Sequence, residues 1–311
     1  MALIKDFREG DRLSQVVLCK YKQLGTARNG KNYYALSFQD KTGIVDAKIW
    51  DLGPGIDHFE ALDYIYIDGE VTSFNGALQI NVKRVRKASE GEYVPADFFP
   101  CSKRDAKQMY EELLEIIAQV KNTYLNQLLQ KIFIDDQEFI KRFKEHSAAK
   151  SVHHNFIGGL LEHTLNVTKI AKNYITIYPE MSEDLLVTAA LCHDIGKVHE
   201  LSSFPENDYT DDGQLIGHII IGYEIISNHI KSIAGFPKKT ASELRHCLLA
   251  HHGKLEFGSP KKPMIIEAMA LNLADEADAK IMMFSSATED LAANEWKYNR
   301  FVENNIRKTN T

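Results

Sequence analysis

The sequence contains little of what marks secreted or membrane proteins. Its 311 residues include only four cysteines, which form no CxxC pair, and this argues against a disulfide framework or a structural zinc knuckle. No run approaches the ~18 apolar residues of a membrane span. The opening segment, MALIKDFREGDRL, lacks the apolar core of a secretory signal. We therefore expect a cytoplasmic protein with reduced thiols and no membrane partner.

Composition and charge indicate a soluble protein of about two domains. Hydrophobic residues make up 44% of the chain and charged residues 26%, and the net charge is −6. Residues 1–90 contain 13 Lys/Arg and 12 Asp/Glu, or about +1, so the remainder carries about −7. An acidic excess in the second part fits carboxylates that need cations.

The first part of the chain has the period of two that is typical of strands with one buried face. Between residues 11 and 87 the pattern predicts five strands, with Asn75-Gly76 as a hairpin turn and Leu78, Ile80 and Val82 pointing inward on the last strand. Residues 54–61 are expected to form a short helix between the third and fourth strands. Five short strands with this helix predict an all-β OB-fold barrel over residues 1–90.

After the barrel the period changes to that of helices. We expect a linker over residues 91–104, where Pro95 and Pro100 interrupt the pattern, and a helical connection over residues 105–150. A helical domain is expected over residues 151–311, with helices continuing to about residue 300. The predicted fold is therefore multidomain, an N-terminal barrel followed by an all-α helical bundle.

Histidines and aspartates in the helical part are too far apart in sequence to meet unless several helices converge. Each is placed where a helix could present it inward, and neutral imidazole with carboxylate is a donor set for divalent metals. A carboxylate can bridge two ions ~3.5–4 Å apart, and Asp194 is the natural bridge. His252 is either a ligand or a support for one. The candidate ligands are His163, His193, Asp194, His218, His251, His252 and Asp275.

A lysine and two cysteines near the candidate ligands each have two possible roles. Lys197, one turn beyond His193, could neutralise charge on a phosphoryl group in the transition state, or could cap the carbonyls of a last helical turn. Cys192 and Cys247 lie near the candidate ligands and would favour zinc as thiolates, but we expect them to be small buried apolar residues.

At these positions the sequence resembles the HD-domain metal-dependent phosphohydrolases, through GGLLEHT around His163 and LCHDIGK around Asp194. The whole layout resembles the YhaM-type 3′-5′ exoribonucleases, which have an OB-fold followed by an HD domain. This resemblance implies an enzyme that removes nucleoside 5′-monophosphates from the 3′ end of single-stranded RNA, with single-stranded DNA as a further substrate. It implies two divalent metal ions, with Mn first and Fe, Co or Zn as alternatives. All seven candidate ligands carry over. Asp194 and Lys197 are the candidate catalytic residues, on the chemical grounds given above.

Two departures from the related HD-GYP phosphodiesterases narrow the expectation. The chain has no GYP motif after its HD pair, and Gly222-Tyr223-Glu224 near His218 is interpreted as a coincidence within a helix. Some of that group place a carboxylate one turn before the first histidine, where this chain has Gly159. We therefore expect two metal ions rather than three.

The barrel is the expected module for single strands, because aromatic side chains interleaved with cations can stack bases and follow a backbone. The same aromatics could instead pack against a neighbouring domain. His153-His154 either contact phosphate near the metals or simply begin a helix. The candidate nucleic-acid-binding residues are Tyr33, Lys48, Trp50, Lys83, Arg84, His153 and His154.

Two other functions compete with RNA trimming. An HD-domain phosphohydrolase could act on a small nucleotide such as a cyclic dinucleotide, although such a substrate needs no strand-binding barrel. An inert scaffold that binds RNA would be expected to have lost some ligands. The sequence leaves homo-oligomer assembly open, and a ring that gates access to 3′ ends would suit a processive nuclease.

Overall fold

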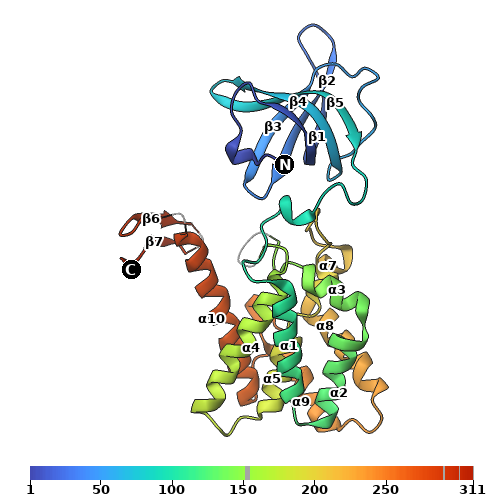
Figure 1. The fold of residues 1–311 in the computed structure, drawn as a ribbon. Helices are drawn as coiled ribbons and strands as arrows, with labels where there is room; N and C mark the ends of the chain where they lie inside the picture. Colours follow the sequence, from blue (N-terminus) through green and yellow to red (C-terminus); the bar gives the residue numbers. More distant parts are fainter. Residues whose placement is uncertain (151–154, 290, 301, 311) are drawn as a thin grey trace. The chain divides into compact units, whose positions relative to one another are not determined.

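The computed structural model describes residues 1–150, 155–289, 291–300 and 302–310 of the chain. They form two compact units, Met1–Cys101 and Ser102–Thr311 (Figure 1). Within the described residues, every helix is too short or too polar to cross a membrane.

The first unit is a closed five-stranded barrel, as the sequence predicts (Figure 1). Its strands follow the order β1-β2-β3-β5-β4, and only the β3–β5 pair is parallel. The bounds are β1 (Arg12–Thr26), β2 (Asn32–Asp40), β3 (Gly43–Ile49), β4 (Tyr64–Phe74) and β5 (Ala77–Lys87), with short 3-10 helices η1 (Ile4–Asp6) and η2 (Pro95–Asp97).

Alternate residues of the strands fill the barrel interior. Phe38 on β2 and Ile80 on β5 are fully buried, and Val82 is 3% exposed. Leu78 lies on the same face of β5 but near the start of the strand, where it is 37% exposed, so it is not part of the buried core. The helix predicted for residues 54–61 is absent. Val85 N donates to Gly55 O and Asp57 N donates to Val85 O, so this segment pairs with β5 instead of with itself. Pro54-Gly55 favours that turn over a helix.

The barrel unit also includes the segment that follows β5. Tyr93 stacks on Tyr64 with ring centroids 3.9 Å apart, and Phe98 is buried beside both rings. Gln39 Nε2 donates to Phe98 O at 3.1 Å. Residues 91–101 of the predicted linker therefore pack as part of this unit, which ends at Cys101.

The second unit is a bundle of helices around one apolar core (Figure 1). Its bounds are α1 (Ala106–Gln119), α2 (Thr123–Gln130), η3 (Lys131–Asp135), α3 (Gln137–Glu145), α4 (Gly159–Ile177), α5 (Glu183–Cys192), α6 (Lys197–Glu200), α7 (Asp211–Leu215), α8 (His218–Ser232), α9 (Lys238–Ala250), η4 (Leu255–Phe257) and α10 (Ile266–Thr288).

Helix α5 lies at the centre of this bundle. Every residue from Leu185 to Cys192 is buried, and α5 packs against α2, α4, α9 and α10. Ser182 caps its N-terminus by accepting from Leu185 N, as expected for a serine at this position. A helix that is apolar on all sides belongs in a core, and α5 thereby carries His193 at its C-terminal end into the interior.

The C-terminal part of the chain differs from the sequence prediction. Helix α10 ends at Thr288 rather than near residue 300, and β6 (Trp296–Asn299) pairs with β7 (Asn304–Arg307) in an antiparallel hairpin (Figure 1). The Arg307 guanidinium lies 5.6 Å from the ring centroid of Trp296. Two strands of four residues are too short for a clear alternation, which explains why the sequence pattern missed them.

Candidate metal centre

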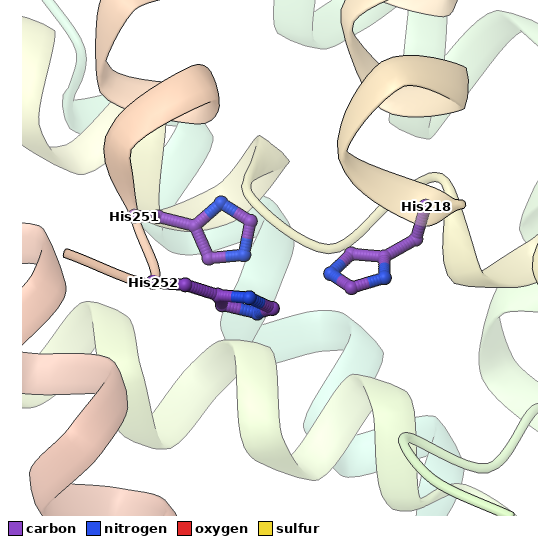
Figure 2. Close-up of side chains that lie close together, drawn as sticks. All are labelled: His218, His251 and His252. Carbon is purple, nitrogen blue, oxygen red and sulfur yellow. The ribbon is translucent and has the colours of Figure 1, made fainter. Parts of the chain in front are cut away.

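The candidate ligands converge from five helices of the second unit. His163 comes from α4, His193 from the end of α5, His218 from the start of α8, and Asp275 from α10. His251 and His252 follow the last residue of α9, and their rings approach that of His218 (Figure 2). His163, His193 and His251 are almost fully buried, which matches the expectation that these histidines face inward.

The ligand atoms form two groups among the described residues. One group is His163, His193 and Asp275, and the other is His218, His251 and His252. Within each group the atoms that could bind a metal lie within 4.8 Å of one another. Three donors brought this close are enough for each group to hold one divalent ion with positions left for other ligands.

Asp194 lies between the two groups. Its Oδ2 is 3.4 Å from Nε2 of His163 and 3.3 Å from Nε2 of His193. Its Oδ1 is 3.5 Å from Nε2 of His218 and 3.7 Å from Nε2 of His251. Each carboxylate oxygen therefore faces a different group, which is the arrangement that a bridging ligand requires.

Hydrogen bonds orient all five imidazoles in the same sense. In each ring Nδ1 contacts an acceptor, which leaves Nε2 directed at the centre. An N–H fixed on Nδ1 leaves the lone pair on Nε2 for a metal. The acceptors are Asp278 Oδ2 for His163 (2.7 Å), Ala190 O for His193 (2.8 Å), Glu200 Oε1 for His218 (2.8 Å), Leu248 O for His251 (2.7 Å) and Phe257 O for His252 (2.9 Å).

Several of these inward-facing atoms have no hydrogen-bond partner among the described residues. Asp194 Oδ1, His218 Nε2 and His251 Nε2 are buried and unpaired. Leaving buried polar atoms unpaired is costly, and a native protein does so where an ion or water completes the site. The donor set of imidazole nitrogens and carboxylate oxygens fits a divalent cation.

Charge at the centre is also arranged for a cation. Burial alone would raise the pKa of Asp194, but Lys197 and His193 hold it well below its usual range. Burial and the neighbouring His252 and His193 lower the pKa of His251, so its imidazole is neutral. Carboxylates bind metal in the ionised form and imidazoles in the neutral form, so both protonation states suit a metal ligand.

His163 lies among the carboxylates of Asp194, Asp275 and Asp278. Burial alone would lower its pKa, but contacts with Asp194, Asp275 and Asp278 outweigh burial and raise the pKa well above its ordinary value. A proton on Nε2 of this imidazole and a metal ion would compete for the same nitrogen lone pair. Metal binding at this group is therefore expected to release a proton.

Lys197 does not cap a last helical turn. It is the first residue of α6, and its Nζ lies 2.6 Å from Asp194 Oδ2. Burial alone would lower its pKa, but the carboxylate of Asp194 raises it, so the ammonium stays protonated. Lys197 also lines a cavity of about 440 Å³ together with His163, His252 and Asp275. A protonated lysine thus lines the same cavity as three of the candidate ligands.

The two nearby cysteines are buried, as predicted. Burial raises the pKa of both the Cys192 and the Cys247 thiol, so neither is a thiolate at neutral pH. Neither belongs to either ligand group among the described residues.

The barrel residues singled out by sequence lie close together on their own unit. The rings of Tyr33 and Trp50 have centroids 4.8 Å apart, and Lys48 Nζ lies 5.1 Å from the centroid of Tyr33. Trp50 and Lys83 line one cavity of about 280 Å³, and Arg84 is exposed on β5 next to Lys83. Lys83 also pairs with Glu70 at 3.3 Å. The predicted residues His153 and His154 lie outside the described residues.

The side chains that orient the candidate ligands were not among the residues predicted from the sequence. Glu200 and Asp278 each accept from a ligand histidine, and Asn272 Nδ2 donates to His251 O at 2.8 Å. Asp278 follows Asp275 by three residues on the same helix, and this spacing was a signal for a shared face. Glu200 and Asn272 carry no comparable signal, because their partners come from other helices.

Comparisons with known proteins agree with this architecture. The HD domain family model matches residues 160–280. The chain is 33% identical over 295 residues to the 3′-5′ exoribonuclease YhaM of Geobacillus sp. (strain WCH70), covering 94% of this chain and 90% of that protein. It is 32% identical over 298 residues to the YhaM of Bacillus velezensis, covering 95% of this chain and 94% of that protein.

Solved structures with OB-folds are also similar to part of the chain. The second OB-fold domain of replication protein A from Methanococcus maripaludis has 17% identity and a TM-score of 0.22, covering 29% of this chain and 96% of that one. The OB domain of Ta0387 from Thermoplasma acidophilum has 19% identity and a TM-score of 0.23, covering 30% of this chain and 90% of that one. At the identities and coverage found for its full-length relatives, the chain belongs to the family of the YhaM 3′-5′ exoribonucleases.

Proposed function

We propose that this protein is a 3′-5′ exoribonuclease that hydrolyses single-stranded RNA at a two-metal centre and releases nucleoside 5′-monophosphates. The observation that carries the proposal is Asp194, whose two oxygens face two separate histidine groups. Family membership supports the RNA substrate and the 3′-5′ direction. Single-stranded DNA is proposed as a second substrate.

The proposed ligands divide between two ions. His163, His193 and Asp275 would hold one, His218, His251 and His252 would hold the other, and Asp194 would contribute to both. When bound, the ions would act as Lewis acids that polarise the phosphodiester and acidify water at neutral pH. We propose Mn²⁺ as the working metal, because a site of imidazole and carboxylate without thiolate also accommodates metals harder than zinc.

The chain's own residues account for the rest of the reaction. Hydrolysis joins a water oxygen to phosphorus and breaks the bond from phosphorus to the 3′ oxygen of the preceding nucleotide. The 5′ phosphate thus leaves with the released nucleotide. Lys197 is protonated and lines the cavity, so it would offset the negative charge that develops on the phosphoryl oxygens. Glu200 and Asp278 would keep His218 and His163 oriented through the reaction.

The barrel would bring the strand to this centre. Tyr33 and Trp50 offer aromatic faces and Lys48 a cation, a combination that holds single strands with little sequence preference. The charge of residues 1–90 is only about +1, so we expect modest affinity that weakens with salt.

The test is cleavage of single-stranded RNA labelled at its 5′ end by metal-stripped protein, with and without Mn²⁺. We expect a ladder that shortens from the 3′ end only when Mn²⁺ is added. His193→Ala and Asp194→Asn should abolish it, whereas His199→Ala, an exposed histidine in the same region, should not. Intact RNA under all conditions would overturn the proposal and direct attention to small nucleotides such as cyclic dinucleotides.

A further inference from the structure

The cavity beside the candidate metal centre is lined by more than the candidate ligands and Lys197. Lys254, Phe257 and Glu276 also line it, and the proposed chemistry does not use them. Its volume of about 440 Å³ lies within the range of sites that bind small molecules, roughly 300–1,000 Å³. A nucleotide whose phosphate meets the ligands would therefore have these further lining residues within the same cavity.

Phe257 is tied to a candidate ligand through its own backbone. It ends the short helix η4, and its carbonyl is the acceptor for Nδ1 of His252 at 2.9 Å. Its N–H donates to Lys254 O at 3.1 Å, which closes the turn. Gly258 then leaves the turn at φ +87°, a conformation that favours glycine. The backbone of Phe257 is thus fixed relative to His252 by bonds that do not involve the ring, and the ring extends from this fixed point.

The Phe257 ring is an exposed aromatic group in a cavity that also contains charged side chains. Phe257 is 57% exposed. The ammonium of Lys254 lies 5.0 Å from its centroid, within the range of a cation–π contact. An exposed aromatic face beside a cation, in a cavity that also holds phosphate-directed groups, matches the chemistry of a nucleotide: a planar base attached to an anion. Stacking on an aromatic ring accepts every base, because each base has a π face.

We propose that Phe257 is the stacking platform for the base of the 3′-terminal nucleotide and so positions the scissile phosphate at the metal centre. This inference rests on the proposed function. It makes Phe257 a positioning residue, and it predicts that the enzyme prefers an end that carries a base over an abasic end, with little preference among bases.

Leu255 provides a matched control on the same short helix. It is 60% exposed, close to the value for Phe257, but it does not belong to the cavity wall among the described residues. If exposed apolar side chains of η4 acted only through a general surface effect, Leu255→Ala and Phe257→Ala would have the same consequence. A stacking role predicts an effect from Phe257 alone.

The test uses two RNAs that are identical except at the 3′ end, one ending in adenosine and the other in an abasic ribose. Removal of the first nucleotide is followed under single-turnover conditions with the full-length, Mn²⁺-loaded protein. We expect the wild type to favour the adenosine end by about tenfold or more in kcat/KM. Phe257→Ala should slow the adenosine end to the rate of the abasic end, Phe257→Trp should restore the preference, and Leu255→Ala should keep it.

Metal content separates this role from support of His252. Phe257→Ala keeps the backbone carbonyl, so its bound Mn²⁺ per chain should equal that of the wild type. A wild-type preference that survives in Phe257→Ala would overturn the inference, and so would an equal loss for both RNAs. Failure of the wild type to shorten either RNA would instead count against the proposed function.

Discussion

Glu200 holds His218 through two contacts made by one oxygen. Its Oε1 accepts from both the backbone N–H and Nδ1 of His218, at 2.9 and 2.8 Å. Burial alone would raise the pKa of Glu200, but the hydrogen bond from His218 lowers it, so the carboxylate is ionised. An ionised acceptor makes the opposite nitrogen of the imidazole a stronger metal ligand.

Replacing Glu200 by Gln is therefore expected to weaken the binding of one of the two proposed metal ions more than that of the other. The amide keeps the shape of the side chain but removes its charge. We expect about 10- to 100-fold lower affinity at the group of His218, His251 and His252, with the other group little changed. Calorimetric titration with Mn²⁺ resolves the two sites. Glu206→Gln, an exposed glutamate nearby, serves as the control, and unchanged affinity in Glu200→Gln would contradict the orienting role.

His146 makes a second prediction at the residue scale, concerning pH. It is buried, and burial lowers its pKa to about 4 from an ordinary 6.5. The unfolded chain takes up a proton here below pH 6.5, whereas the folded chain does so only near pH 4. The contribution of the neutral His146 side chain to the free energy of unfolding is thus fully present above pH 6.5. It is lost as the pH falls from there through 4, and the total loss approaches about 3 kcal/mol.

His146→Leu should remove this part of the acid sensitivity. Urea unfolding of metal-free protein at pH 7 and at pH 4.5 measures the free energy of unfolding for both chains. We expect the wild type to lose more stability than the variant between these two pH values. Equal losses would show that His146 is protonated in the folded protein as readily as in the unfolded chain.

At the scale of elements, Gly196 sets how closely α8 approaches the turn after α5, and Gly222 on α8 lies opposite it. A Cβ at Gly196 would lie 2.0 Å from His218 O and 2.7 Å from Gly222 N, so only glycine fits there. A Cβ at Gly222 would meet its nearest atom at 3.4 Å, an ordinary contact. Gly196 follows Asp194 by two residues, so this close approach also brings His218 to within 3.5 Å of Asp194.

Alanine substitution should change the free energy of unfolding much more at Gly196 than at Gly222. Gly196→Ala forces backbone apart and is expected to lower the free energy of unfolding by about 3 kcal/mol and to weaken Mn²⁺ binding. Gly222→Ala should cost little, because alanine favours the helix by about 1 kcal/mol over glycine. Thermal unfolding and metal titration of both variants check this. A Gly222→Ala variant as unstable as Gly196→Ala would refute the proposed asymmetry.

The same elements show how much the sequence could predict. The barrel strands and the ligand helices were predictable because each carries its own period of buried residues. The hairpin of β6 and β7 is too short to show one, and residues 54–61 depend on pairing with β5 across the barrel. That the candidate ligands would meet was predictable from their residue types on separate helices. Their division into two groups, and the roles of Glu200 and Asn272, follow from contacts between helices that no local pattern contains.

At the scale of the whole molecule, the barrel and the helical unit each have their own core. The barrel core includes Phe38, Ile65 and Ile80, and the helical core includes Leu113, Leu160 and Leu248. All candidate ligands lie in the second unit, whereas Tyr33 and Trp50 lie in the first. Chemistry and strand binding are therefore expected to be separable, because no candidate ligand comes from the barrel.

A chain of residues 102–311 tests this separation. It begins where the second unit begins, so Phe98 and Phe99 are not left exposed on it. We expect it to hydrolyse bis(p-nitrophenyl) phosphate at close to the full-length rate, because the metal ligands are intact. On long RNA it should lose about tenfold or more in kcat/KM, since stacking and cationic contacts on the barrel are gone. Full-length Tyr33→Ala/Trp50→Ala should show the same selective loss. Equal loss on both substrates would mean that the barrel is needed to build the centre itself.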